Sequence, residues 1–146
     1  MLGACDSGTE PDSVGSPSLL IGPKWLPAAH TVSPGVDYND DGVIVTNTFA
    51  IEGACDHDDT TRFLSATKWS GDEGASKCDP SSPQIETGTY FFNAAGDSVT
   101  MTSDVDGVPT TGKVLALTAT KFSVSVRSDN YPDNKSRIET FTWVAK

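Results

Sequence analysis

Alternation of apolar and polar residues dominates the second half of the chain. Residues 121–127 place Phe122, Val124 and Val126 on one face, and residues 137–145 alternate in the same way. A period of two is that of a β-strand with one face buried. We expect strands over residues 25–32, 60–70 (one long strand or two short ones divided near Ala66), 86–93, 98–102, 112–117, 121–127 and 137–145.

Turn-forming residues separate these segments. Residues 94–97 and 107–109 contain Gly or Pro at hairpin spacing, and residues 33–42 and 128–135 are polar loops. Residues 43–53 fit either a strand, from their leading β-branched residues, or a short helix capped by the following Thr and Asn; we favour the helix. Seven or eight antiparallel strands indicate an up-and-down barrel or a sandwich.

Composition and charge narrow the partners. The 146 residues suit one domain, and 20 acidic against 10 basic residues give a net charge of -10. Such a surface repels phosphate backbones and anionic lipids, so we expect no nucleic-acid partner and no electrostatic membrane binding. No apolar run approaches the about 18 residues of a spanning helix, so any membrane attachment should be covalent.

The first cysteine points to such an attachment. Leu2-Gly3-Ala4-Cys5 resembles a bacterial lipobox, in which the cysteine is acylated; the alternative is a buried or free thiol near a frayed end. Residues 6–18 contain Gly, Pro, Ser and acidic residues with a single Val, which predicts a flexible tether. Residues 1–18 therefore read as a lipobox remnant and acidic tether, and residues 19–146 as the folded domain.

The other two cysteines form an even pair. Cys55 and Cys78 enclose 22 residues, and export would supply the oxidising environment that a disulfide needs. A pair of zinc thiolates is the alternative, although no CxxC motif accompanies the two residues.

Several loose motifs, in this order, resemble the lipocalin-like surface lipoproteins of Bacteroidetes-type bacteria. They are Leu20-Ile21-Gly22-Pro23-Lys24-Trp25, Cys55-Asp56-His57-Asp58-Asp59 followed by Phe63, the turn from Gly71 into Cys78, Thr87-Gly88-Thr89-Tyr90-Phe91-Phe92, with Tyr90 where the family has Trp, and the strand and turn from Val114 to Lys121. The resemblance covers nearly all of residues 19–146. It implies a small antiparallel barrel, export and lipidation, and no particular ligand.

We therefore expect an all-β, lipocalin-like barrel of about eight strands with one short helix, a Cys55–Cys78 disulfide and an acylated Cys5. The expected location is the bacterial cell envelope, as an outer-membrane lipoprotein facing the periplasm or the surface. The leading function is to bind or sense a small apolar ligand in the barrel. The alternative is a non-catalytic accessory subunit of an outer-membrane protein complex, with a filled barrel.

Asp37-Tyr38-Asn39-Asp40-Asp41-Gly42 fits the first half of a calcium loop, with Asp37, Asn39, Asp41 and the Val43 carbonyl as ligands. The twelfth position is Thr48, where a bidentate Glu is needed, so weak calcium binding is one interpretation. An acidic Asx-rich turn that binds nothing is the other. His57, among three aspartates, suits a solvated loop better than a transition-metal site.

The aromatic residues are the best indication of a cavity. Those on strands or at their starts, with one methionine, either pack the core or leave space for a ligand: Trp25, Phe63, Tyr90, Phe92, Met101, Phe122, Phe141 and Trp143. The sequence contains no Ser/His/Asp arrangement, no G-x-S-x-G elbow and no paired carboxylates typical of acid–base catalysis, so we expect a protein that is not an enzyme.

Overall fold

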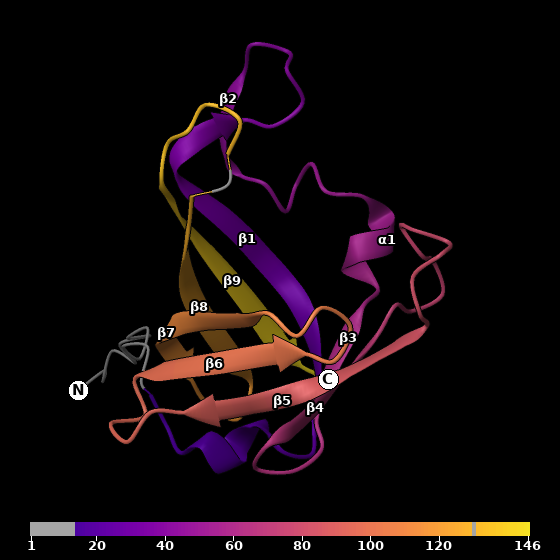
Figure 1. Ribbon diagram of the computed structural model, residues 1–146, viewed down its shortest axis with the longest axis vertical. Helices are drawn as coiled ribbons and strands as arrows, with labels where there is room; N and C mark the ends of the chain where they lie inside the picture. Colours follow the sequence, from indigo (N-terminus) through magenta and orange to yellow (C-terminus); the bar gives the residue numbers. More distant parts are fainter. Residues whose placement is uncertain (1–13, 130) are drawn as a thin grey trace, which may run out of the picture.

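The computed structural model describes residues 14–129 and 131–146, and over these ranges the chain forms an antiparallel β-barrel (Figure 1). Eight strands pair in the order β1-β3-β4-β5-β6-β7-β8-β9, and β9 pairs with β1 to close the barrel. β2 is an extra strand that pairs with the C-terminal half of β1, between Thr31 and Asp37. The strands are β1 (Lys24–Asp37), β2 (Ile44–Asn47), β3 (Thr60–Phe63), β4 (Lys68–Asp72), β5 (Ile85–Phe92), β6 (Ser98–Ser103), β7 (Pro109–Leu117), β8 (Lys121–Ser128) and β9 (Arg137–Ala145).

The expected barrel and most of the expected strands are confirmed. Residues 60–70 form two short strands, and the period-two pattern of β8 buries Phe122 and Val124 inside the barrel. The hairpin at residues 94–97 turns at Gly96, whose φ of 74° favours glycine. Local alternation and turn chemistry therefore specified the meander from β3 to β9.

Two expectations between residues 33 and 53 are wrong. Residues 33–37, expected in a loop, continue β1, since Ser33 pairs with Ile138 of β9 and Val36 with Val45 of β2. Residues 44–47, expected in a helix, form β2. The one short α-helix of the described residues, α1 (Ala54–His57), lies after the range 43–53 in which a helix was expected.

The N-terminal part closes one end of the barrel. Val14 forms a parallel bridge with Leu117, and Gly15 N–H donates to the Leu117 carbonyl at 2.7 Å. The 3-10 helix η1 (Pro17–Leu20) follows, and the carbonyl of fully buried Leu20 accepts the indole N–H of Trp25 at 2.9 Å. Residues 14–18, which were expected in the tether, therefore contact the barrel, whereas Cys5 lies outside the described residues.

Aromatic rings fill the interior next to this closed end. Trp25, Phe63 and Phe122 meet edge to face, with ring centroids 6.2 Å apart for Trp25–Phe122 and 6.0 Å for Phe63–Phe122. Tyr90 packs against Phe63 at 4.8 Å, and its hydroxyl donates to the Ser65 carbonyl at 2.6 Å. The hydroxyl and the indole N–H both have partners, as buried polar groups require.

The Trp69 side chain packs directly against Gly88, the residue opposite it on β5, because glycine has no side chain there. A Cβ added to Gly88 would come within 2.5 Å of Trp69 Nε1 and 2.2 Å of the Thr102 carbonyl oxygen. A Cβ on Gly71 would meet only ordinary contacts, the nearest atom being Cζ3 of Trp69 at 3.4 Å. Gly88 is therefore required for packing, whereas Gly71 is not.

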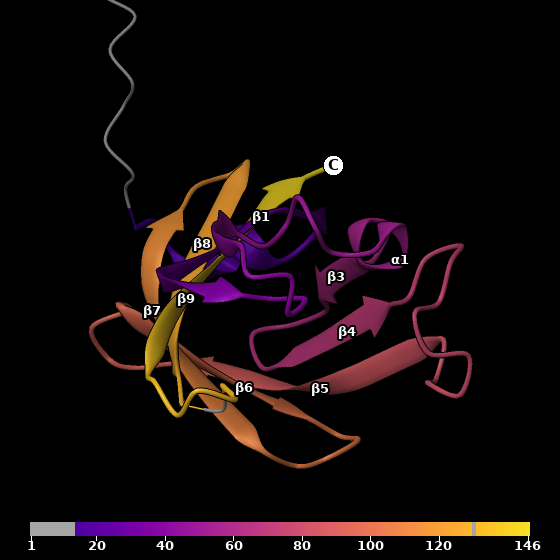
Figure 2. The same ribbon diagram turned by 90° about the horizontal axis from the view of Figure 1, so that it is seen from above.

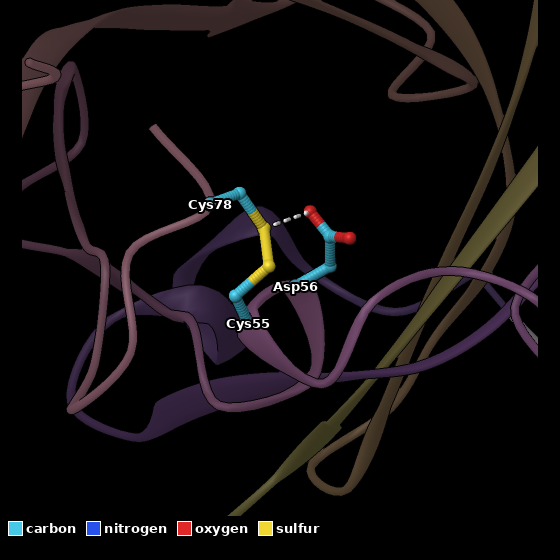
Figure 3. A group of neighbouring side chains, drawn as sticks. All are labelled: Cys55, Asp56 and Cys78. Atoms are coloured by element: carbon cyan, nitrogen blue, oxygen red, sulfur yellow. Dashed lines mark hydrogen bonds between the residues drawn. A yellow bond between two sulfur atoms is a disulfide. The ribbon is translucent and has the colours of Figure 1, made fainter. Parts of the chain in front are cut away.

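The disulfide Cys55–Cys78 is present, as expected (Figure 3). It joins α1 to the connection between β4 and β5, with the two Cα atoms 5.2 Å apart. Among the described residues, no helix has the length and apolar character to cross a membrane.

Candidate functional site

The barrel end opposite η1 is where β1, β8 and β9 extend beyond the other strands (Figure 1). Residues that pair across strands share one face, so the register shows which side chains point inward. Trp25 pairs with Ala145, Pro27 with Trp143, His30 with Phe141 and Val32 with Glu139. Since Trp25 and Val32 are buried, this set faces the barrel interior.

A β-bulge turns His30 inward. Pro27 pairs with Trp143, but the next paired residue is Ala29, opposite Thr142, so β1 has one extra residue here. Without the extra residue, Pro27 and His30 would face opposite sides, because three positions separate them. Bulges often redirect side chains in this way next to functional sites.

The chain after β2 completes the wall beside His30. β3 pairs with β1 only at Lys24 and Trp25, which leaves the middle of β1 without a strand on that side. Residues 48–57, which we call the cover segment, run alongside: the Thr48 and Phe49 N–H groups donate to the His30 carbonyl at 3.1 and 3.2 Å. Figure 2 shows this segment leading from β2 into α1, which forms its last part.

His30 links the cover segment to β9. Its Nδ1 is hydrogen-bonded to Glu52, and its Nε2 lies 3.0 Å from Glu139 Oε2. The imidazole also stacks on Phe141, with centroids 4.1 Å apart and an interplanar angle of 20°. Because an ionised carboxylate only accepts, the ring can donate to both partners only as an imidazolium. About 16% of each of the three side chains is exposed, so the cluster reaches the surface.

Two cavities are bordered by Phe141, the ring on which His30 stacks. The first, the aromatic–acidic cavity, is about 280 Å³ and is lined by His30, Glu52 and Asp56 with Tyr38, Phe49, Phe141 and Trp143, among others. The second, the apolar cavity, is about 230 Å³ and is lined by Phe141 and Trp143 again, with Met101, Phe122, Val124 and Val126. Phe141 and Trp143 therefore border both cavities.

The aromatic residues that the sequence singled out divide into two groups. Trp25, Phe63 and Tyr90 are buried near the closed end, and Phe92 packs against them. The space left among Trp25, Phe63, Met101, Phe122 and Trp143 is only about 30 Å³. Met101, Phe122, Phe141 and Trp143 line the apolar cavity, so the barrel is filled at one end and hollow at the other.

Carboxylates also line the opposite inner wall. Glu86 lies on the face of β5 that carries Gly88 and buried Tyr90, and it accepts a hydrogen bond from the Ser103 hydroxyl. Asp59 and Glu73 share a cavity of about 140 Å³ with it. Burial, reinforced by the negative charges of Glu73, Asp58, Asp56 and Asp72, raises the pKa of Asp59 to about 6. This part of the inner wall thus has a crowded negative charge.

The charge of Arg137, whose side chain faces inward on β9 two residues before Glu139, is neutralised by an ion pair with Asp133. Arg137 at the start of β9 makes two bonds of 2.7 Å to the Asp133 carboxylate, which hold the pKa of Asp133 below its usual range. Its guanidinium lies 4.3 Å from the Tyr131 ring centroid. Burial and a hydrogen bond to Glu139 raise the pKa of Tyr131 to about 12, so Tyr131 stays neutral.

The predicted calcium loop contains an Asx-type turn. The Asp37 carboxylate accepts the N–H groups of Asp41 (3.1 Å) and Gly42 (2.9 Å), and Asp41 accepts the N–H of Val43 (2.8 Å). Thr48, at the twelfth position, is buried and donates to the His30 carbonyl instead. Of the two interpretations of this loop, the missing twelfth ligand favours the Asx-rich turn that binds no calcium.

The other metal hypotheses concerned Cys55, Cys78 and His57. Over the described ranges, the one group of three His, Cys, Asp or Glu ligand atoms within 4.8 Å of one another is Cys55, Asp56 and Cys78. Its sulfurs form the disulfide, with Asp56 Oδ1 3.2 Å from Cys78 Sγ, so they offer no thiolate (Figure 3). His57 stacks on Phe49 and bonds its carbonyl at 2.9 Å, which holds the cover segment.

Sequence reasoning identified the aromatic side of the site and missed its charged side. His30, Glu52 and Glu139 are far apart in the chain and carry no motif. The pattern of β9 did place Glu139 on the face of Phe141 and Trp143, and a charged residue on an apolar strand face was the available signal.

No model of a known protein family matches this chain, and comparison with curated proteins finds no similar sequence.

Proposed function

We propose that the protein binds a small, largely apolar molecule at the hollow end of its barrel. The observation that carries the proposal is the pair of adjoining cavities that share Phe141 and Trp143. Small-molecule sites are typically hollows of about 300–1,000 Å³ with apolar walls and a few polar groups. The two cavities, of about 280 and 230 Å³, are each close to the lower limit of that range, and His30, Glu52 and Asp56 are the ionisable side chains other than Tyr38 that line the first of them.

The cluster favours binding over catalysis. Both nitrogens of His30 are engaged by carboxylates, so neither is free to remove a proton from a substrate. We therefore propose a non-catalytic protein that carries or senses its ligand.

We further propose that the domain is a lipoprotein of the lipocalin-like type, anchored to the bacterial outer membrane by acylated Cys5. The motif Leu2-Gly3-Ala4-Cys5 supports the anchor, and a disulfide is typical of exported proteins. Expression in a bacterium fed a clickable palmitate analogue tests it: the analogue should label the protein, and Cys5→Ser should abolish the label. Label that persists in this variant refutes the anchor.

Two adjacent threonines offer a matched test of the cavity. Thr110 lines the apolar cavity, whereas Thr111 faces outward and bonds Thr100 Oγ1 at 2.7 Å. A neutral fluorescent probe, N-phenyl-1-naphthylamine, should bind the wild-type protein. Thr110→Phe should weaken this binding at least tenfold, because its ring takes up the cavity, and Thr111→Phe should leave it unchanged. Equal effects of the two variants would refute the proposed site.

The alternative function, an accessory subunit in an outer-membrane complex, has one favourable observation. Ile85 and Phe91 on the outer face of β5 are 51% and 58% exposed. Native mass spectrometry of protein isolated from its host membrane separates the two: a small bound mass supports the carrier, and a co-isolated protein with no small ligand supports the subunit.

A further inference from the structure

The aromatic–acidic cavity combines two kinds of group. The rings of Tyr38, Phe49, Phe141 and Trp143 lie around it, and Glu52 and Asp56 of the cover segment add carboxylates. Aromatic faces attract cations through the ring quadrupole, and carboxylates do so by charge. Both features favour a positively charged group over a neutral or negative one.

The internal charges leave the cavity negative. His30, the one basic residue among those that line it, lies between two carboxylates, and it can balance only one of them. The Glu139 carboxylate also accepts a hydrogen bond from the Tyr131 hydroxyl. Within the described part of the chain, the second oxygen of Glu52 accepts no hydrogen bond, so it is free to receive one from a ligand.

Nearby positive side chains do not cancel this charge. Among the residues that the structure describes, no Lys or Arg lines either cavity, and Arg137 is bound to Asp133. The carboxylates of the opposite wall, Asp59, Glu73 and Glu86, add to the negative potential. Low-dielectric walls focus such a potential and raise the local concentration of cations.

The apolar cavity defines the rest of the ligand. It begins at Phe141 and Trp143 and continues to Met101, Val124 and Val126, and none of the described residues that line it is charged. A ligand with its cationic group near Glu52 would therefore place an apolar body beyond these two rings. A molecule that is charged throughout would leave this second cavity unused.

We propose that the ligand is a small organic cation, an amine with an aromatic or alkyl body. Its ammonium group lies against Glu52 and Asp56 among the aromatic rings, and its body fills the apolar cavity. This inference rests on the proposed function, since it assigns the chemistry of that same ligand.

Three probes of similar shape test it: 2-phenylethylamine, 2-phenylethanol and 3-phenylpropionate, which are a cation, a neutral molecule and an anion at pH 7. Their affinities for the full chain with its disulfide intact are measured by calorimetry. The amine should bind at least about tenfold tighter than the alcohol, and the anion weakest, as expected for a charge-assisted hydrogen bond.

Glu52→Gln should remove most of the preference for the amine. Asp104→Asn is the matched control, because Asp104 is an exposed carboxylate outside the cavities and bonds Thr87 Oγ1 at 2.7 Å; it should keep the preference. Should Glu52→Gln fail to fold, Asp56→Asn removes a charge from the same wall and should also lower the preference.

The outcomes separate this inference from the proposed function. If the alcohol binds as tightly as the amine, or the anion binds best, the cation assignment is overturned while the binding function stands. If none of the three probes and no neutral fluorescent probe binds, the function itself is overturned. A preference for the amine that survives both Glu52→Gln and Asp56→Asn also overturns the assignment.

Discussion

Removing the disulfide should destabilise the domain through its unfolded state. Cys55 and Cys78 are 23 positions apart, and closing a loop of that length in the unfolded chain is worth about 3 kcal/mol in the chain-entropy model. For roughly 130 folded residues with an unfolding entropy of about 2.1 cal/mol/K each, the loss corresponds to a drop of about 10 °C in Tm. Against a typical domain stability of 5–15 kcal/mol, the barrel should still fold.

The assay is urea unfolding of the double variant Cys55→Ser/Cys78→Ser, followed by tryptophan fluorescence. The unbridged chain exposes more surface when it unfolds, so the slope of the free energy of unfolding against urea should rise as the midpoint falls. Cys5→Ser is the control and should match the wild-type protein. A loss below about 1 kcal/mol would refute the entropic reasoning, and so would a large loss in the Cys5→Ser control.

Three further predictions follow from single residues. Gly88→Ala should cost about 3 kcal/mol in urea unfolding, since its Cβ would meet backbone at 2.2 Å, whereas Gly71→Ala should cost less than about 1; similar losses would contradict the packing argument. Asp59→Asn should stabilise the protein above pH 6 and have little effect below about pH 4. The raised pKa of Asp59 means that folding disfavours its ionised form. The free energy of unfolding of the wild-type protein therefore falls as pH rises from 3.8, the pKa of Asp59 in the unfolded chain, to about 6. Thermal unfolding at pH 4 and 7.5 checks this, and an effect that is equal at both pH values would exclude it. Calcium at about 1 mM should leave Tm unchanged, because Thr48 replaces the bidentate ligand of the loop that starts at Asp37; a rise would assign calcium to that loop.

The sequence predicted the barrel because its signals are local. Alternation and hairpin turns specify β5 to β9 without knowledge of distant contacts, and the cysteine pair could be matched by elimination. The errors concern β1, where Pro34 and Gly35 suggest a loop. Both lie in the irregular stretch between the paired positions Thr31 and Val36, where a strand tolerates them. A Cβ on Gly35 would also come within 2.8 Å of the Val45 carbonyl, so this glycine permits the approach of β2.

The charged half of the site could not be predicted for a related reason. His30 faces the interior only because β1 gains one residue after Pro27, and a period-two reading from Trp25 places it outside. Glu52 arrives from a segment that was assigned to a helix and in fact runs along β1. Both features depend on how β1 pairs with β9 and on the short pairing of β3 with β1, which ends at Trp25. These pairings join distant parts of the chain.

The position of the inward carboxylates is informative in itself. A net charge of -10 ordinarily resides on the outer surface, where water solvates it at little cost. Here Glu86 and Glu139 occupy inner-facing positions, and within residues 14–129 and 131–146 the partners that offset their partial burial are Ser103, His30 and Tyr131. Apolar residues at these two positions would extend the core of the closed end and give a more stable barrel. The unfavourable charges occur at the end that contains the cavities, which is where a cation could reach them.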